Sequence, residues 1–137
     1  MKIMGIDYGD RRTGIALSDD TEFLAGGVTT IKSSDPEAVA DKVTEICAEN
    51  HVTEIVLGLP KNMDGSEGFR AEHTRAFGDL LTLRMPEAEI IYFDERMTTM
   101  AAAQYMNITD VRGKKRKNSI DMLAAKIILQ DYLDSKR

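Results

Sequence analysis

The sequence is poor in the side chains that form disulfides and bind soft metals. It contains one cysteine, Cys47, and two histidines among 137 residues. A single cysteine cannot form an internal disulfide, and the separation of His51 and His73 does not fit a zinc site. No Ser-His or Cys-His pairing stands out, which argues against covalent catalysis by an activated nucleophile.

Long hydrophobic runs are also missing. No stretch reaches the roughly 18 apolar residues that cross a membrane, and the N-terminus has no signal-peptide pattern. The hydrophobic content of 42% and charged content of 30% are ordinary for a globular protein. We therefore expect a cytoplasmic protein with one domain spanning residues 1–137, long enough to form a single core.

Negative charge outnumbers positive charge overall, but the positive charge is concentrated locally. The net charge of −5 argues against indiscriminate binding of nucleic acid. Residues 112–117 nevertheless contain five cations, and two more follow the first apolar run. These candidate phosphate-binding residues are Arg11, Arg12, Arg112, Lys114, Lys115, Arg116 and Lys117. Neither an aromatic stacking platform nor a base-reading motif is evident, so the pattern does not distinguish RNA from DNA.

Hydrophobic periodicity predicts alternating strands and helices after an initial run of strands. Strands are expected at residues 2–8, 14–18, 27–31, 54–59 and 89–93. Helices are expected from a cap at Ser34 to about residue 50, over 67–84, from Thr98 or Thr99 to Tyr105, and from a cap at Ser119 to about 133. Residues 60–68 and 107–118 have the composition of loops.

This order of elements indicates an α/β fold. The first three strands suit an antiparallel meander, joined by a polar connection over residues 10–13. The last two strands follow helices, and right-handed crossovers would place them parallel in the same sheet. We expect a five-stranded mixed sheet flanked by helices.

Asp7 is an acidic residue inside the first apolar run, between Gly5 and Gly9. Aspartate is disfavoured in strands, and an unpaired buried carboxylate is unfavourable. A bound cation would be a natural partner for this side chain. The alternative is a structural role in the turn that follows.

Two further acids occupy positions at which sites often form. Glu95 directly follows the last predicted strand, and sites in α/β sheets gather at strand ends; a surface ion pair is the alternative. Asp121 shares a helix sector with the otherwise apolar Ala124, Ala125, Ile128 and Tyr132. An acid on an inward stripe suggests a functional role, although an acid in a first helical turn also interacts favourably with the helix dipole.

Together, Asp7, Glu95 and Asp121 could form a carboxylate cluster. Oxygen ligands select hard cations, so one or two Mg²⁺ or Mn²⁺ ions are the expected cofactors. Such ions serve displacement at phosphorus. The basic residues precede Asp121 or follow Asp7 closely, where they could deliver a phosphate backbone; solubility is the alternative role for a lysine-rich loop.

Four motifs in order carry a resemblance over essentially the whole chain. They are GIDYGDRRTGIA at residues 5–16, GLPKNMDGS at 58–66, DERMTT at 94–99 and DMLAAKIIL at 121–129. Together they resemble the YqgF family, ribonuclease H-like proteins described as pre-16S rRNA nucleases or Holliday junction resolvases.

The resemblance implies a ribonuclease H-like fold and a metal-dependent endonuclease, with the acidic triad on Asp7, Glu95 and Asp121. The implied substrate is structured nucleic acid: the 5′ end of precursor 16S rRNA in ribosome biogenesis, or alternatively four-way DNA in recombination and repair. Residues 62–65 also match the family, and their role stays open between approaching the substrate and shaping a turn through Gly65.

Two other functions deserve a test. Asp-x-Gly followed by Gly-x-Ala also resembles the phosphate loop of actin-like and sugar-kinase ATPases, although that architecture needs two lobes and 137 residues provide one. A non-catalytic RNA-binding factor for ribosome assembly is the third possibility. The protein could be a monomer or a homodimer; a resolvase that cuts symmetrically would need two active sites, and so a dimer.

Overall fold

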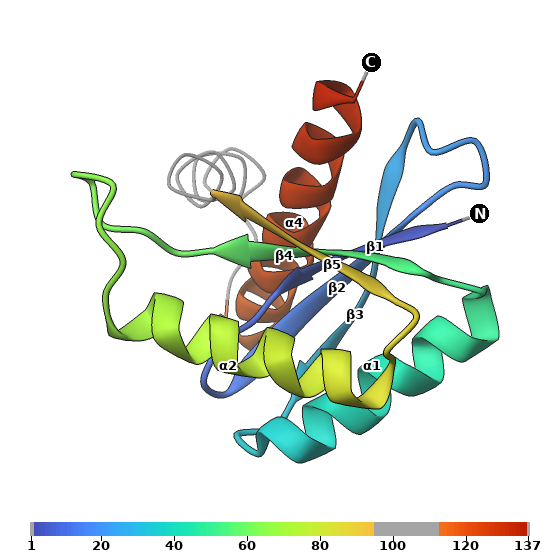
Figure 1. Ribbon diagram of the computed structural model, residues 1–137. Helices are drawn as coiled ribbons and strands as arrows, with labels where there is room; N and C mark the ends of the chain where they lie inside the picture. Colours follow the sequence, from blue (N-terminus) through green and yellow to red (C-terminus); the bar gives the residue numbers. More distant parts are fainter. Residues whose placement is uncertain (1, 95–112, 137) are drawn as a thin grey trace.

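The computed structural model describes residues 2–94 and 113–136, and for positions 113–121 it describes the backbone alone. Its centre is one mixed sheet in the order β3-β2-β1-β4-β5 (Figure 1). The strands are β1 (Ile3–Asp7), β2 (Arg12–Ser18), β3 (Ala25–Lys32), β4 (Glu54–Leu59) and β5 (Glu89–Asp94). Strands β1 to β3 are antiparallel neighbours, whereas β4 is parallel to both β1 and β5. The predicted meander with two parallel additions is confirmed.

The first hairpin is tighter than the sequence indicated. Strand β2 begins at Arg12, not at Gly14, because Arg12 and Thr13 pair with Lys32 and Ile31 of β3. The polar connection therefore covers residues 8–11, and Arg12 belongs to the sheet. Pairing with β3 outweighs the low strand propensity of this charged segment.

Three helices are described: α1 (Pro36–Asn50), α2 (Phe69–Arg84) and α4 (Gly113–Ser135). Asp35, rather than the predicted Ser34, caps α1, since its carboxylate accepts the backbone N–H of Glu37 at 3.1 Å. His51 ends α1 in the left-handed conformation, with φ of 56°. The helix predicted near residues 98–105 lies outside the described residues.

Helix α4 corrects the prediction for the basic segment. It begins at Gly113 and continues to Ser135, so residues 113–118 are helical and Ser119 does not cap the helix. Lysine and arginine have high helix propensity, which permits a helix through a run that composition alone assigned to a loop. Most of the predicted phosphate-binding residues therefore lie along the first turns of α4.

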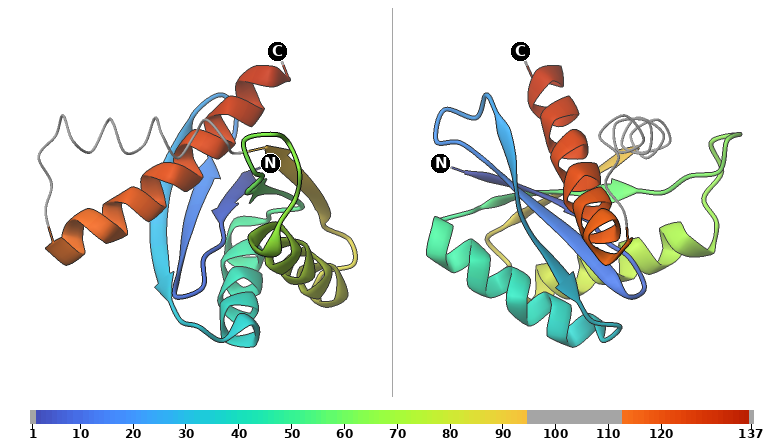
Figure 2. Two further views of the ribbon diagram at one scale, coloured as in Figure 1. Left: turned by 90° about the vertical axis from the view of Figure 1, so that its left-hand side faces the viewer. Right: turned by 180° about the vertical axis from the view of Figure 1, so that it is seen from behind.

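The helices cover opposite faces of the sheet, with α1 and α2 on one and α4 on the other (Figures 1 and 2). Alternation along β1 divides its side chains accordingly. Met4 and Ile6 belong to the core beneath α1 and α2, whereas Ile3 belongs to the core beneath α4. Asp7 follows the same alternation, which assigns it to the α4 face.

Cys47 is a buried residue of α1. Burial raises the pKa of its thiol to about 11, so the group is uncharged near neutral pH. Among the helices that the structure describes, none has the length and apolar character required to span a bilayer.

Candidate active site at the carboxyl end of the central strand

Asp7 is the last residue of β1, the central strand of the sheet. It is partly buried, and its register partner on β2 is Gly14. On the other side of β1, Ile6 pairs with Leu57 of β4, so the following residue, Gly58, lies beside Asp7. A carboxylate at the carboxyl end of a central strand has the position at which α/β sheets commonly bind ligands.

The strand neighbours of Asp7 contribute no side chains beside it. Residues directly opposite in neighbouring strands point to the same face, so Gly14 and Gly58 are the positions whose side chains would crowd the carboxylate. Both are glycine and both are buried. The sequence therefore keeps bulk away from the Asp7 carboxylate on both sides of β1.

Helix α4 crosses the face to which Asp7 belongs. Gly5 lies against it so closely that a Cβ at this position would be 2.7 Å from Cβ of Leu129 and 2.9 Å from the carbonyl oxygen of Ala125. Farther along the sheet, a Cβ at Gly27 of β3 would be 3.4 Å from Cβ of Met122. Glycines at the crossing points thus allow the helix to sit close to the strands.

Position 121 immediately precedes Met122, which lies against Gly27. The turn of α4 that carries Asp121 therefore lies over the sheet near β3. The structure therefore places Asp7 and the backbone of position 121 on one side of the sheet. Glu95 follows β5 and lies outside the described residues, as does the side chain of Asp121. Within the described part of the chain no group of three potential metal ligands is found, and the meeting of the three carboxylates stays a prediction.

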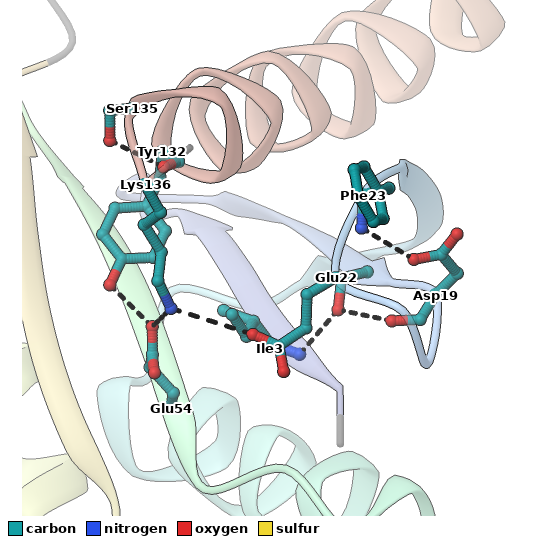
Figure 3. Close-up of polar contacts among 9 residues, drawn as sticks. Ile3, Asp19, Glu22, Phe23, Glu54, Tyr132, Ser135 and Lys136 are labelled. Carbon is teal, nitrogen blue, oxygen red and sulfur yellow. Dashed lines mark hydrogen bonds and ion pairs between the residues drawn. The ribbon is translucent and has the colours of Figure 1, made fainter.

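A polar cluster anchors the carboxyl-terminal end of α4 to the sheet (Figure 3). The hydroxyl of Tyr132 donates to Glu54 at the start of β4, at 2.6 Å. The ammonium of Lys136 lies 3.5 Å from the same carboxylate and 3.7 Å from Glu22. Because Glu54 pairs with Ile3, this anchor lies at the end of β1 opposite to Asp7. The anchor fixes one end of the helix whose other half carries Asp121.

We expect Tyr132→Phe to lower the free energy of unfolding by about 1.5–3 kcal/mol, the usual contribution of a hydrogen bond to a charged group. Burial, followed by the hydrogen bond to Glu54, raises the pKa of Tyr132 above its ordinary value. The unfolded chain would then lose its tyrosine proton first, so this stabilisation should be present below pH 10 and decline above it.

Urea denaturation at pH 7 and above pH 10 measures both effects. Tyr92→Phe is the matched control, since the Tyr92 hydroxyl makes a longer contact, 3.4 Å to the carbonyl of Arg75. Equal stability of the two variants at pH 7 would show that the Tyr132 contact does not anchor α4.

The predicted phosphate-binding residues come from two segments. Arg11 is exposed in the turn after β1, and Arg12 is half-buried in β2. Residues 114–117 form part of the first turns of α4, described by backbone alone, and Arg112 lies outside the described residues. Their contact with phosphate stays a prediction.

The β4–α2 loop is shaped by its own hydrogen bonds. Ser66 donates through its backbone and its hydroxyl to the Asp64 carboxylate, at 2.9 and 2.6 Å. The Asn62 amide donates to the Ser66 hydroxyl at 3.0 Å, and Gly65 has a φ of 89°. Only glycine adopts that conformation without strain. Of the two roles left open, shaping the turn is the one these contacts support.

A group of aromatic residues lies beside Asp7 and was not predicted from the sequence. Tyr8, the next residue, stacks on Phe77 of α2 with ring centroids 4.1 Å apart. One turn earlier on α2, His73 contacts Phe69 at 4.2 Å between centroids. A hollow of about 210 Å³ opens here, lined by Tyr8, Pro36, His73, Ala76, Phe77 and Leu80. The available signal was the four-residue spacing of Phe69, His73 and Phe77 on one helix face.

Known proteins of similar sequence are numerous, and the matches span the chain. The family model described as "RuvX: Holliday junction resolvase" matches residues 1–135. A protein of Acetivibrio thermocellus named "Putative pre-16S rRNA nuclease" is 44% identical over 137 residues, covering 99% of this chain and 97% of its own. A protein of Clostridium tetani with the same name is 46% identical over 135 residues, covering 98% and 97%.

Solved structures of low sequence identity share the fold. The structure "T. thermophilus RuvC in complex with Holliday junction substrate" has a TM-score of 0.62 at 13% identity, covering 99% of this chain and 95% of that one. The fowlpox virus resolvase in complex with Holliday junction DNA has a TM-score of 0.58 at 12% identity, covering 99% of both chains. These similarities confirm the ribonuclease H-like fold.

Proposed function

Because the chain belongs to the RuvX family of Holliday junction resolvases, a family of nucleases, we propose that it is a metal-dependent endonuclease of structured nucleic acid with its active site at Asp7, Glu95 and Asp121. The observation that carries this proposal is the position of Asp7. Its carboxylate ends the central strand, between two glycines, on the face that α4 crosses. The whole chain, residues 1–137, acts as one nuclease domain in this proposal.

The donor set suits a hard divalent cation. Asp7, Glu95 and Asp121 offer carboxylate oxygens and no nitrogen or sulfur, the chemistry that Mg²⁺ and Mn²⁺ prefer. Bound there, one or two such ions would supply an activated water and stabilise charge on the leaving oxygen. Asp7 would contribute a ligand from a rigid strand, which fixes its direction better than a loop would.

The basic residues would hold the substrate rather than take part in the hydrolysis. Arg11 and Arg12 follow Asp7 by four and five residues, and Arg112, Lys114, Lys115, Arg116 and Lys117 lie before Asp121. Cations at these positions would bind phosphates on both sides of the reacting bond. The negative charge of the rest of the chain would limit binding elsewhere.

The preferred substrate is precursor 16S rRNA, cut near its 5′ end during ribosome biogenesis in the cytoplasm. The names of the relatives, at more than 40% identity over nearly the whole chain, support this choice. Four-way DNA is the second candidate, and the description of the family favours it. The two candidates differ in the oligomer that they require, because symmetric cleavage of a junction needs two copies of the site.

One experiment separates these substrates. Labelled precursor 16S rRNA and a synthetic four-way junction are incubated in parallel with the protein in Mg²⁺, in Mn²⁺ and in EDTA. We expect cleavage of the rRNA at discrete positions with either metal and none in EDTA. Preferential, paired cuts in the junction would instead assign the protein to recombination.

The same assay excludes the remaining functions. Metal-independent RNA binding without cleavage would indicate an assembly factor, and tight Mg-ATP binding by calorimetry without cleavage would indicate an ATPase. Either result would contradict the nuclease proposal. Protein purified identically with Asp7→Asn controls for contaminating nucleases.

A further inference from the structure

We propose that the hollow between α1 and α2 binds an unpaired nucleobase of the substrate strand, next to the phosphodiester held at Asp7. The inference rests on the proposed nuclease function and adds a feature of the substrate: an unstacked nucleotide beside the cleavage position. Tyr8, His73 and Phe77 line the hollow, and Phe69 lies against His73 beside it. In this proposal the base stacks on the exposed rings of His73 and Phe69.

The hollow and the candidate active site share one strand end. Asp7 and Tyr8 are consecutive, and alternation directs them to opposite faces of the sheet. Asp7 belongs to the α4 face, while Tyr8 packs with the core beneath α1 and α2 and stacks on Phe77. A nucleic-acid strand that passes over the carboxyl end of β1 would therefore meet the carboxylate on one side and the aromatic hollow on the other.

The exposed rings have the properties of a stacking platform. Phe69 is 65% exposed and contacts His73, whose side chain is 51% exposed. Aromatic side chains of this kind stack on nucleobases of any sequence, because every base has a π-face.

The charges around the hollow favour a base over a phosphate. The Asp10 carboxylate lies 3.9 Å from Nδ1 of His73. Asp10 and Asp35 are both close enough to Tyr8 to contribute, after burial, to raising its pKa. Two carboxylates would repel a phosphate group. The same oxygens can accept hydrogen bonds from the amino and imino groups on the edge of a base.

The size of the hollow fits one aromatic ring system. Its volume is about 210 Å³, and the lining combines flat rings with the small side chains of Pro36 and Ala76. The base would have to leave a paired stack to enter, at an energetic cost that is smallest at a mismatch, junction or single strand. The hollow thus selects substrates that are already unpaired near the cut.

Fluorescence of 2-aminopurine tests this proposal without cleavage. An oligonucleotide carrying 2-aminopurine at one position is titrated with the protein in EDTA, as a single strand and as a full duplex. We expect the single strand to be quenched on binding and the duplex to be unaffected. Phe69→Ala and His73→Ala should abolish quenching and weaken single-strand binding about tenfold, in the range found for removing an aromatic stacking partner.

Matched variants exclude a general effect of altering α2. Leu83→Ala removes a side chain that is 81% exposed on the same helix, and it should bind and quench as the parent does. Phe69→Tyr and His73→Phe keep a ring and should retain the quenching. Urea denaturation confirms folding, which is not endangered at Phe69 because that ring is mostly exposed.

The outcomes are distinct from those for the nuclease proposal. Unchanged quenching in Phe69→Ala and His73→Ala, or no quenching by the parent protein, would overturn the base-binding inference even if metal-dependent cleavage is observed. Ring-dependent quenching with no cleavage of any substrate would support the hollow as a base site and contradict the nuclease proposal.

Discussion

The Asp7→Asn variant is expected to fold like the parent protein and to cleave nucleic acid more than about 100-fold more slowly, since even residues that only support metal ligands typically contribute 10–100-fold. Asparagine has nearly the same shape and can occupy the end of β1. It lacks the negative charge that makes a carboxylate a good ligand for a hard cation. Folding is preserved because no buried charge is introduced.

Single-turnover cleavage with saturating metal measures this effect, and thermal unfolding verifies the fold. Asp20→Asn is the matched control: it makes the same change at an exposed residue in the turn between β2 and β3. The control should cleave at the parental rate. An Asp7→Asn protein as active as Asp20→Asn would exclude Asp7 from the active site and remove the basis of the nuclease proposal for this strand end.

The second large effect is expected at Gly5. A valine there would place Cβ 2.7 Å from Leu129 and 2.9 Å from the backbone oxygen of Ala125, closer than side-chain carbons approach. The helix cannot move away without losing its packing, so we expect a loss of about 3 kcal/mol, at the upper end for overpacked cores. Because α4 carries Asp121, cleavage should fall together with stability.

Gly26→Val is the matched control, because a Cβ at Gly26 would have no neighbour within 4 Å. Valine favours strands over glycine by up to about 1 kcal/mol, so this variant should be neutral or slightly stabilised. Urea denaturation of both variants gives the comparison. If Gly5→Val were as stable as Gly26→Val, the result would contradict the close packing of α4 against β1.

Hydrophobic patterning was sufficient to predict the sheet. A continuous apolar run distinguishes β4, a parallel strand covered by helices on both faces, from the strands of the meander. Capping signals around residues 34–37 predict the start of α1 within a residue or two. The errors lie where local signals compete with tertiary ones. Arg12 joins β2 because β3 pairs with it, and the cations after Gly113 join α4, although composition favours a loop.

The candidate site could be predicted in part. Asp7 is recognisable because a carboxylate interrupts an apolar strand, and the structure places it at a strand end on the α4 face. The glycines that surround it in the sheet, Gly14 and Gly58, come from segments 44 residues apart, and register alone brings them to either side of Asp7. The assignment of the Glu95 and Asp121 side chains to the candidate site rests on the sequence pattern.

The sequence by itself determined the family and the mixed sheet of three antiparallel and two parallel strands, and it singled out the acids proposed for hydrolysis, because these follow from motifs and short-range periodicity. The tertiary structure decided which residues become neighbours of Asp7. Tyr8, His73 and Phe77 look like ordinary core or surface residues in the linear sequence. Only the packing of α2 beneath the end of β1 gathers their rings into one hollow, since contacts between distant segments depend on the position of whole elements and leave little local signal.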